Sequence, residues 1–186
     1  MNKKNFINKE NNILFVGGNT YGSDGPVLNF IKICKSHNIN FSILTTKKRA
    51  EYPVLSYKNF KTALISNKYK YYISDKISLS LLKKITDKNT IIFAATTFWI
   101  FDEKIIMHFK NRIFNYHNIS ISDFRGAAGH SWRLMQDISK TTISIHCVSN
   151  EIDAGEICIQ KKISFPKSIN NLKSSYEYLE KHENNL

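Results

Sequence analysis

Short runs of β-branched and aromatic residues alternate along this chain with segments of helical periodicity. The alternation predicts an α/β fold, in which a sheet is built from strands joined by crossover helices. We predict strands at about 12–17, 40–46, 70–74, 90–96, 112–117, 141–148 and 156–163. We predict helices at about 24–37, 77–87, 102–110, 126–137 and 168–184.

The order of these segments indicates how the strands are connected. The first four strands should be largely parallel, because right-handed crossovers join parallel neighbours. The last two strands have no predicted helix between them, so they should form a hairpin-type pair around the loop that contains Asp153. No internal repeat or low-complexity linker interrupts the pattern, and residues 1–186 are therefore expected to form a single domain.

The composition is sufficient for one hydrophobic core, because 42% of the 186 residues are hydrophobic and 12% are aromatic. The formal net charge of +12 favours an anionic partner, such as nucleic acid, a nucleotide diphosphate or an acidic membrane. However, Lys, Asn and Ile are abundant throughout the chain, and a nucleotide bias in the gene explains the charge equally well. Residues 47–49 are the only run of three basic residues, so we do not expect nucleic-acid binding.

The cysteines and the first residues bear on the compartment. Cys34, Cys147 and Cys158 are too far apart for a CxxC metal or redox motif, and their odd number indicates unpaired thiols in a reducing compartment. The apolar run at residues 13–16 is far too short for a signal-peptide core or a membrane span. We therefore expect a soluble, cytoplasmic protein with no metal site and no membrane contact.

A glycine-rich segment follows the first predicted strand and contains Gly17, Gly18, Asn19 and Tyr21. It ends at Asp24, which is followed two residues later by a proline and so fits the start of a helix. Such a loop can present backbone N–H groups and a helix dipole to a phosphate. The glycine spacing matches neither GxGxxG nor the P-loop motif, and a tight turn that needs glycines explains the segment as well.

An amide, an imidazole and a carboxylate form the strongest candidate for chemistry. Asn115 and His117 are two apart in a predicted strand, so they project to one face while Tyr116 projects to the other. Their N–H groups can hold a carbonyl oxygen and stabilise the charge that develops on it, where one donor is worth on the order of 3 kcal/mol. Asp153 could orient the imidazole, raise its pKa and help to move protons. Gly155 allows a sharp backbone path beside a ligand.

Two segments around these residues carry a recognisable pattern. Residues 112–126 read RIFNYHNISISDFRG, and residues 141–157 read TTISIHCVSNEIDAGEI. They hold an Asn-x-His at a strand end, an Arg-Gly turn eight residues after the histidine, and an Ile-Asp-x-Gly loop. With this order and spacing, the chain from about residue 13 to residue 163 resembles the catalytic domain of the folate-dependent N-formyltransferases. The resemblance implies a Rossmann-like domain with a mostly parallel, twisted sheet flanked by helices.

The resemblance also implies a reaction, which is transfer of a formyl group from N10-formyltetrahydrofolate to a primary amine. A neutral amine attacks the formyl carbon, Asn115 and His117 hold the oxyanion, and Asp153 supports proton movement to the leaving nitrogen. No covalent intermediate with the enzyme is formed. The implied folate pocket consists of Phe98, Trp99, Ile100, Phe101, Ser149, Glu151 and Ile152, and the implied amine-substrate contacts are Gly18, Asn19, Tyr21 and Arg125.

Other residues in the matching region have weaker implications. The aromatic side chains of Phe98–Phe101 would be core residues if they did not line a pocket. His146 is expected to be structural, and His130 has no assigned role. Residues 118–122, NISIS, replace a Pro-Ser-Leu-Leu-Pro segment that is usual in the family, so this loop should be less rigid.

The Arg125-Gly126 turn limits the choice of acceptor substrate, because it is more typical of the methionyl-tRNA and nucleotide-sugar branches of the family than of the purine branch. We see no further domain for tRNA, so a nucleotide-linked amino sugar, such as a dTDP-4-amino-4,6-dideoxyhexose made for surface polysaccharide, is the preferred substrate. Glycinamide ribonucleotide is the alternative. Members of the family usually carry more C-terminal sequence that binds the acceptor or forms a homodimer, so this chain is either a truncated form or an unusually short member.

Two hypotheses from other classes remain open. The chain could be a non-catalytic folate or nucleotide binder. It could also be a basic RNA-binding module, for which residues 69–72, YKYY, provide aromatic and basic side chains together. An ordinary amphipathic strand explains that segment equally well.

Overall fold

The computed structural model describes residues 12–19 and 24–183 of the chain. These residues form one sheet of seven strands in the order β3-β2-β1-β4-β5-β6-β7. The strands are β1 (Asn12–Gly17), β2 (Asn40–Thr45), β3 (Tyr71–Ile73), β4 (Ile91–Ala95), β5 (Ile113–His117), β6 (Lys140–Cys147) and β7 (Ile157–Ser164). The helices are α1 (Val27–Ser36), α2 (Lys47–Ala50), α3 (Phe60–Ser66), α4 (Leu79–Ile85), α5 (Glu103–Phe109), α6 (Gly129–Met135) and α7 (Leu172–Glu183).

The strand pairing confirms the predicted α/β fold. Strands β1 to β5 are parallel to one another. Strand β6 is antiparallel to β5, and β7 is antiparallel to β6. The predicted hairpin-type pair around the Asp153 loop is therefore present. The chain order of the strands reverses at β1, which has β2 on one side and β4 on the other. In open α/β sheets, ligands bind beyond the carboxyl ends of the strands near such a point.

Hydrophobic side chains alternate along the strands and fill both faces of the sheet. In β1, Ile13 and Phe15 belong to one core cluster, and Leu14 and Val16 belong to the other. Burial on both faces explains why the central strands read as continuous apolar runs. The first cluster also contains residues of α1, α3 and α7, and the second contains residues of α4 and α5.

The region between β2 and β3 differs from the prediction, because it contains α2 and α3, which the sequence pattern did not indicate. Thr46 caps α2 by accepting a hydrogen bond from the N–H of Arg49, and Asn59 caps α3 by accepting one from the N–H of Thr62. The helices have only four and seven residues. With four residues, α2 is little more than one turn and shows no helical period. Helix α3 is as long as α4, α5 and α6, which were predicted, so its length does not explain the difference.

The start of α1 also differs from the prediction. The helix begins at Val27 rather than near residue 24. The carboxylate of Asp24 accepts hydrogen bonds from the N–H and the hydroxyl of Ser56, so it does not cap the helix. Instead the side-chain oxygen of Asn19 accepts a hydrogen bond of 3.4 Å from the N–H of Leu28. Helix α6 likewise begins at Gly129 rather than at 126, after Ala128 with a φ of 64°.

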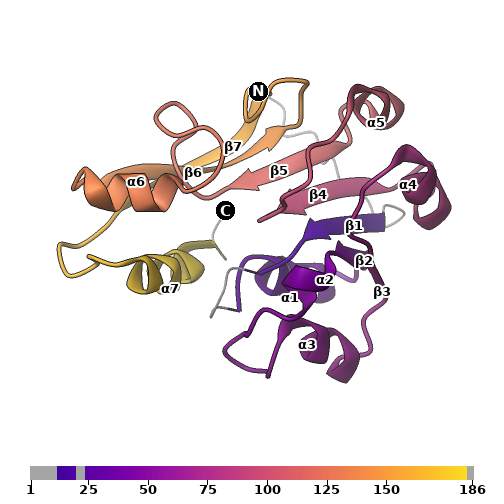
Figure 1. The fold of residues 1–186 in the computed structure, drawn as a ribbon, viewed down its shortest axis with the longest axis horizontal. Helices are drawn as coiled ribbons and strands as arrows, with labels where there is room; N and C mark the ends of the chain where they lie inside the picture. Colours follow the sequence, from indigo (N-terminus) through magenta and orange to yellow (C-terminus); the bar gives the residue numbers. More distant parts are fainter. Residues whose placement is uncertain (1–11, 20–23, 184–186) are drawn as a thin grey trace.

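Helices α6 and α7 are fastened to one another and to the rest of the chain by polar contacts. Arg133 of α6 donates a hydrogen bond of 2.7 Å to the hydroxyl of Ser175 in α7, and its guanidinium lies 3.9 Å from the ring centre of Phe165. Glu180 of α7 accepts a 2.7 Å hydrogen bond from the N–H of Gly25. Figure 1 shows the arrowheads of β1, β4 and β5 pointing toward the side of the molecule on which α6 and α7 lie. No helix in the described ranges is long and apolar enough to cross a membrane.

The position of Leu179 in the core leads to a stability prediction. Its side chain is 1% exposed, whereas Leu172 in the same helix is 41% exposed. We expect Leu179→Ala to lower the free energy of unfolding by about 2–5 kcal/mol, because the substitution leaves a cavity in the core. Leu172→Ala, the matched control, should cost less than about 1 kcal/mol. Urea unfolding followed by circular dichroism measures both, and equal losses would contradict this packing of α7.

Candidate active site

A cavity of about 1190 Å³ opens at the carboxyl ends of β4 and β5. Segments from most of the chain form the walls of the cavity, and residues of α7 form one of these walls. The lining residues are Arg49, residues 52–55, 96–101, 115–119, 126–130, His146, residues 148–153, Leu172, Lys173 and Tyr176.

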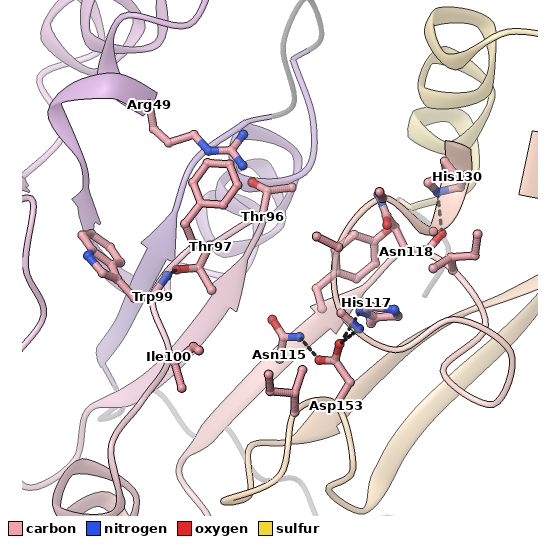
Figure 2. Close-up of a pocket in the computed structure, with 18 of the residues that line it drawn as sticks. Arg49, Thr96, Thr97, Trp99, Ile100, Asn115, His117, Asn118, His130 and Asp153 are labelled. Atoms are coloured by element: carbon pink, nitrogen blue, oxygen red, sulfur yellow. Dashed lines mark hydrogen bonds and ion pairs between the residues drawn. The ribbon is translucent and has the colours of Figure 1, made fainter. Parts of the chain in front are cut away.

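The three predicted catalytic residues meet at this cavity, and Figure 2 shows their side chains turned toward one another. The amide nitrogen of Asn115 donates a hydrogen bond of 3.2 Å to Oδ1 of Asp153. Nδ1 of His117 lies 3.4 Å from Oδ2 of Asp153. Tyr116, between the two strand residues, is 4% exposed and belongs to the core on the other face. The two-residue period of β5 therefore separates chemistry from packing as predicted.

His146 belongs to the same network, although the sequence analysis expected it to be structural. It stands opposite Asn115 in the antiparallel pairing of β5 and β6. Its Nδ1 lies 2.9 Å from the carbonyl oxygen of Cys147, which can only accept, so this nitrogen carries a proton. In the neutral ring, Nε2 is then an acceptor, and it lies 3.2 Å from the amide nitrogen of Asn115 and 3.4 Å from Oδ1 of Asp153.

These contacts fix the direction of the Asn115 amide. Its nitrogen faces Asp153 and His146, so its two hydrogens have partners within the protein. Figure 2 shows the amide oxygen on the side away from Asp153. Asn115 is thus held in one rotamer with its amide plane fixed, which is the geometry required of a group that must meet a small reacting carbonyl.

The carboxylate of Asp153 is the centre of this network. Besides Asn115, it accepts a hydrogen bond of 2.8 Å from the backbone N–H of Gly126. Burial raises the pKa of Asp153, but a hydrogen bond from the protonated ring of His146, the charge of protonated His117 and the Gly126 N–H together bring it below its ordinary value. Asp153 is therefore a carboxylate at neutral pH.

His117 faces two oxygen atoms. Its Nε2 donates to the carbonyl oxygen of Phe124 at 3.0 Å, and its Nδ1 faces Asp153. Burial lowers the pKa of His117, while the charge of Asp153 and the Phe124 carbonyl oppose that effect and the charge of His146 adds to it. The ring is thus neutral at neutral pH, with an unprotonated Nδ1 beside a carboxylate. Such a nitrogen can accept a proton, and the carboxylate stabilises the imidazolium that results.

The loop that carries Asp153 has an unusual backbone. Asp153 itself has a φ of 49°, in the left-handed region, where Asp is among the residues that are tolerated. Gly155 is required for a different reason than the sharp turn predicted from the sequence. A Cβ at Gly155 would lie 1.7 Å from the carbonyl oxygen of Cys147, so only glycine allows the loop to pack this closely against β6.

All seven predicted folate-pocket residues line the cavity. In the first segment the side chains alternate, because Phe98 and Ile100 are 62% and 73% exposed whereas Phe101 is buried in the core. Trp99 is partly buried and donates from its ring N–H to the carbonyl oxygen of Asp75 at 3.3 Å. In the second segment, the hydroxyl of Ser149 donates to the carbonyl oxygen of Glu151 at 3.1 Å. The core alternative for the aromatic side chains thus holds for Phe101.

The predicted substrate residues, unlike the predicted folate-pocket residues, do not line the cavity where the structure describes them. Gly18, Asn19 and Arg125 are not among the residues that line the cavity, and Tyr21 lies outside the described residues. The N–H of Gly18 donates to the carbonyl oxygen of Ala95 at 3.2 Å, and its own carbonyl accepts from the hydroxyl of Thr96. Asn19 is fully buried and caps α1. These polar groups bond within the protein, which favours the tight-turn explanation for Gly17–Asn19.

The glycine turn packs the end of β1 against the end of β4. Gly17 has a φ of 132°, and a Cβ there would lie 2.0 Å from the carbonyl oxygen of Ala95. Arg49, which the sequence analysis treated only as part of a basic run, lines the cavity beside this turn. Within the described ranges, no group of three or more His, Cys, Asp or Glu side chains could hold a metal ion.

Comparison with known families agrees with this geometry. A sequence model described as "Formyl transferase" matches residues 26–185, which include every member of the Asp153 network. This chain belongs to the formyl transferase family.

One curated relative of this formyl transferase chain shows how much of a longer protein the chain matches. Methionyl-tRNA formyltransferase from Fusobacterium nucleatum is 27% identical over 154 residues, which make up 81% of this chain and 48% of that protein. The chain therefore spans about half the length of this curated relative.

Solved structures of formyl transferases share the fold. Phosphoribosylglycinamide formyltransferase from Bacillus halodurans has a TM-score of 0.71 at 16% identity, covering 94% of this chain and 90% of that one. A sugar 3N-formyl transferase, WlaRD, solved in the presence of dTDP and 5-N-formyl-THF, has a TM-score of 0.67 at 18% identity, covering 91% of this chain and 58% of that one. At these identities the likeness shows the fold, and it confirms the predicted Rossmann-like architecture.

The buried His130 at the edge of the cavity leads to a prediction for this formyl transferase chain. Its Nε2 donates to the carbonyl oxygen of Asn118 at 2.9 Å, and its Nδ1 has no partner among the described residues. Burial, together with the charge of Arg133, lowers the pKa of His130 from 6.5 to about 4. The hydrogen bond to the Asn118 carbonyl raises the pKa, but by less. Between these two pH values the unfolded chain binds a proton that the folded chain does not. The free energy of unfolding should therefore decrease as the pH falls from 6.5 to about 4.

The contribution of His130 should be at most about 3 kcal/mol, because one pKa unit corresponds to about 1.4 kcal/mol. His130→Gln keeps a donor for Asn118 but does not titrate, so its unfolding free energy should decrease less on acidification. His37→Gln, a change at an exposed histidine, should follow the wild type. Urea titrations at a series of pH values measure this, and identical pH dependence in wild type and His130→Gln would contradict the assignment.

Proposed function

We propose that this chain is the catalytic part of a folate-dependent enzyme that transfers a formyl group from N10-formyltetrahydrofolate to the amine of a nucleotide-linked amino sugar. The observation that carries the proposal is the convergence of Asn115, His117 and Asp153 on one large cavity. Membership of the formyl transferase family supports the reaction type. The similarity to a sugar 3N-formyl transferase solved with dTDP supports the acceptor class.

The cavity is suitable for a folate. Its volume of about 1190 Å³ exceeds the range of roughly 300–1,000 Å³ that is usual for small-molecule sites, so there is room for a second substrate. Exposed apolar side chains at Phe98, Ile100 and Ile152 provide walls for a flat heterocycle.

The bound folate would supply a formyl group on nitrogen, whose carbon is open to attack by an amine. In our proposal, the amide of Asn115 and the imidazole of His117 stabilise the negative charge on the formyl oxygen. The charge that develops on this oxygen makes it a stronger acceptor than His146 Nε2 and the Phe124 carbonyl, the neutral partners of Asn115 and His117, so it can compete for those N–H donors. Asp153, which accepts a hydrogen bond from Gly126, balances the proton that His117 takes from the attacking amine. That proton passes to the folate nitrogen as its bond to the formyl carbon breaks, so that the formylated amine and tetrahydrofolate are released.

The nucleotide sugar would belong to the synthesis of surface polysaccharide, such as the O-antigen of lipopolysaccharide. A second acceptor, glycinamide ribonucleotide, is favoured by the phosphoribosylglycinamide formyltransferase fold, of which this chain covers 90%. Both acceptors combine a primary amine with phosphate groups. The contacts with Gly18, Asn19, Tyr21 and Arg125, the cytoplasmic location and the homodimer stay predictions, as do the non-catalytic and RNA-binding alternatives.

A mass-spectrometric formylation assay tests the proposal. The purified chain is incubated with N10-formyltetrahydrofolate and a panel of dTDP- and UDP-linked amino sugars, with glycinamide ribonucleotide as the alternative acceptor. We expect one amino sugar to become heavier by one formyl group. Formylation of glycinamide ribonucleotide alone would favour the second candidate, and binding of folate without any product would contradict the proposed activity.

Substitutions in the network separate turnover from binding. We expect Asn115→Ala and His117→Ala each to reduce the rate of transfer by about 10²–10³-fold, as is found when one donor to a developing oxyanion is removed. Asp153→Ala should also reduce the rate severely, because it removes the carboxylate that balances the proton on His117. Binding of 5-formyltetrahydrofolate should persist, because the network acts on the transition state rather than on the folate rings.

The control for these variants is His37→Ala, at the exposed end of α1, which should transfer at the wild-type rate. Asp153→Asn keeps the acceptor for Gly126 and removes the charge, so it should also lose turnover while keeping its stability. Near-normal turnover in His117→Ala would rule out the proposed mechanism.

A further inference from the structure

One wall of the cavity contains a buried cation that the proposed chemistry does not use. Arg49, the third residue of α2, is 9% exposed and lines the cavity. Its Nη1 donates a hydrogen bond of 2.9 Å to the carbonyl oxygen of Asn19. Its Nε is buried and has no hydrogen-bond partner among the described residues. Nor does any carboxylate in the described ranges form an ion pair with it.

The guanidinium is held in place by aromatic rings instead of by an acid. Its central carbon lies 4.1 Å from the ring centre of Phe98 and 4.9 Å from that of Tyr52. These rings position the planar group and attract its charge through their faces. Burial lowers the pKa of Arg49, yet a guanidinium remains charged at neutral pH. The wall therefore carries a positive charge that no acidic side chain of the described protein neutralises.

The bonding pattern leaves one edge of the guanidinium for a ligand. Nη1 is bound to Asn19, and Nε, which shares the opposite edge with Nη2, has no partner among the described residues. Two parallel N–H groups on such an edge match two oxygen atoms of one phosphate group. A buried charged donor without a partner is costly unless a ligand completes it.

We propose that Arg49 binds a phosphate group of the acceptor substrate through its Nε–Nη2 edge. This inference rests on the proposed function, since both candidate acceptors carry phosphate. Figure 2 places Arg49 and Ile100 on different sides of Thr97, with Ile100 near Asn115 and Arg49 farther from it. An acceptor whose amine lies at Asn115 and whose phosphate lies at Arg49 would thus extend along the cavity past residues 96–98.

Other polar groups near Arg49 are consistent with an anion. Lys173 and Tyr176 of α7 line the same cavity. Burial raises the pKa of the Tyr176 hydroxyl, which therefore stays protonated and can donate a hydrogen bond, while the charge of Arg49 opposes that rise. Lys173 is exposed and 4.0 Å from Glu177, so its charge is shared with a partner and Arg49 is the stronger anchor.

Calorimetric titration with pyrophosphate and with dTDP tests this site without any formyl donor or amine. We expect Arg49→Met to weaken the binding of both by about tenfold or more, since hydrogen bonds to charged groups are of that strength. Lys48→Met, the exposed neighbour in α2, should change either affinity by less than about twofold, as for other surface charges. Binding of 5-formyltetrahydrofolate should be unchanged in both variants.

Arg49→Lys protects the test against a folding defect, because it keeps the charge and most of the packing. It should melt like the wild type but bind pyrophosphate more weakly, since an ammonium cannot present two parallel N–H groups. The proposal would be overturned if Arg49→Met bound pyrophosphate with wild-type affinity, or if this variant lost folate binding while it kept pyrophosphate binding. A chain that formylates no acceptor but loses pyrophosphate binding in Arg49→Met would refute the proposed function and keep the phosphate site.

Discussion

The buried carboxylate of Asp153 is the constraint around which the site is arranged. A carboxylate that is removed from water must be compensated by donors and by positive charge. Here Asn115 of β5 and Gly126 of the loop before α6 donate hydrogen bonds to it, and His117 and His146 lie 3.4 Å away, where protonation of either ring adds a positive charge. One side chain thus connects two strands and two loops, and the same contacts orient Asn115 and His117 at the cavity.

The sheet supplies the rigid frame for this arrangement. Parallel strands buried on both faces bring their carboxyl ends to one edge, where loops can extend beyond the core. The polar residues Asn115 and His117 stand at the end of a strand whose other face is packed in the core. Arg49 and Phe98 come from the loops and the short helix beyond this edge. The site therefore combines side chains fixed by the sheet with side chains fixed by loop packing.

Much of this could be predicted from the sequence, because it depends on local periods. The strands follow from apolar runs, and the shared face of Asn115 and His117 follows from the two-residue repeat. The role of His146 depends on the register of β6 against β5, which no local pattern contains. Helix α2 has only four residues and shows no helical period, so the position of Arg49 beside the cavity could not be predicted. The sequence left two explanations open for the glycines after β1, a phosphate loop and a tight turn, and the close approach of Gly17 to Ala95 favours the turn.

Helix α7 gives the cavity its last wall, and this has a consequence for the order in which the site is built. Two hydrogen bonds hold the helix in place, one from the N–H of Gly25 to Glu180 and one from Arg133 of α6 to Ser175. The helix contributes Leu172, Lys173 and Tyr176 to the lining of the cavity. During synthesis on the ribosome, the strands with Asn115 and His117 emerge well before this helix. A nascent chain can therefore form its sheet early, but it cannot enclose a substrate until the segment around residue 180 has left the ribosome.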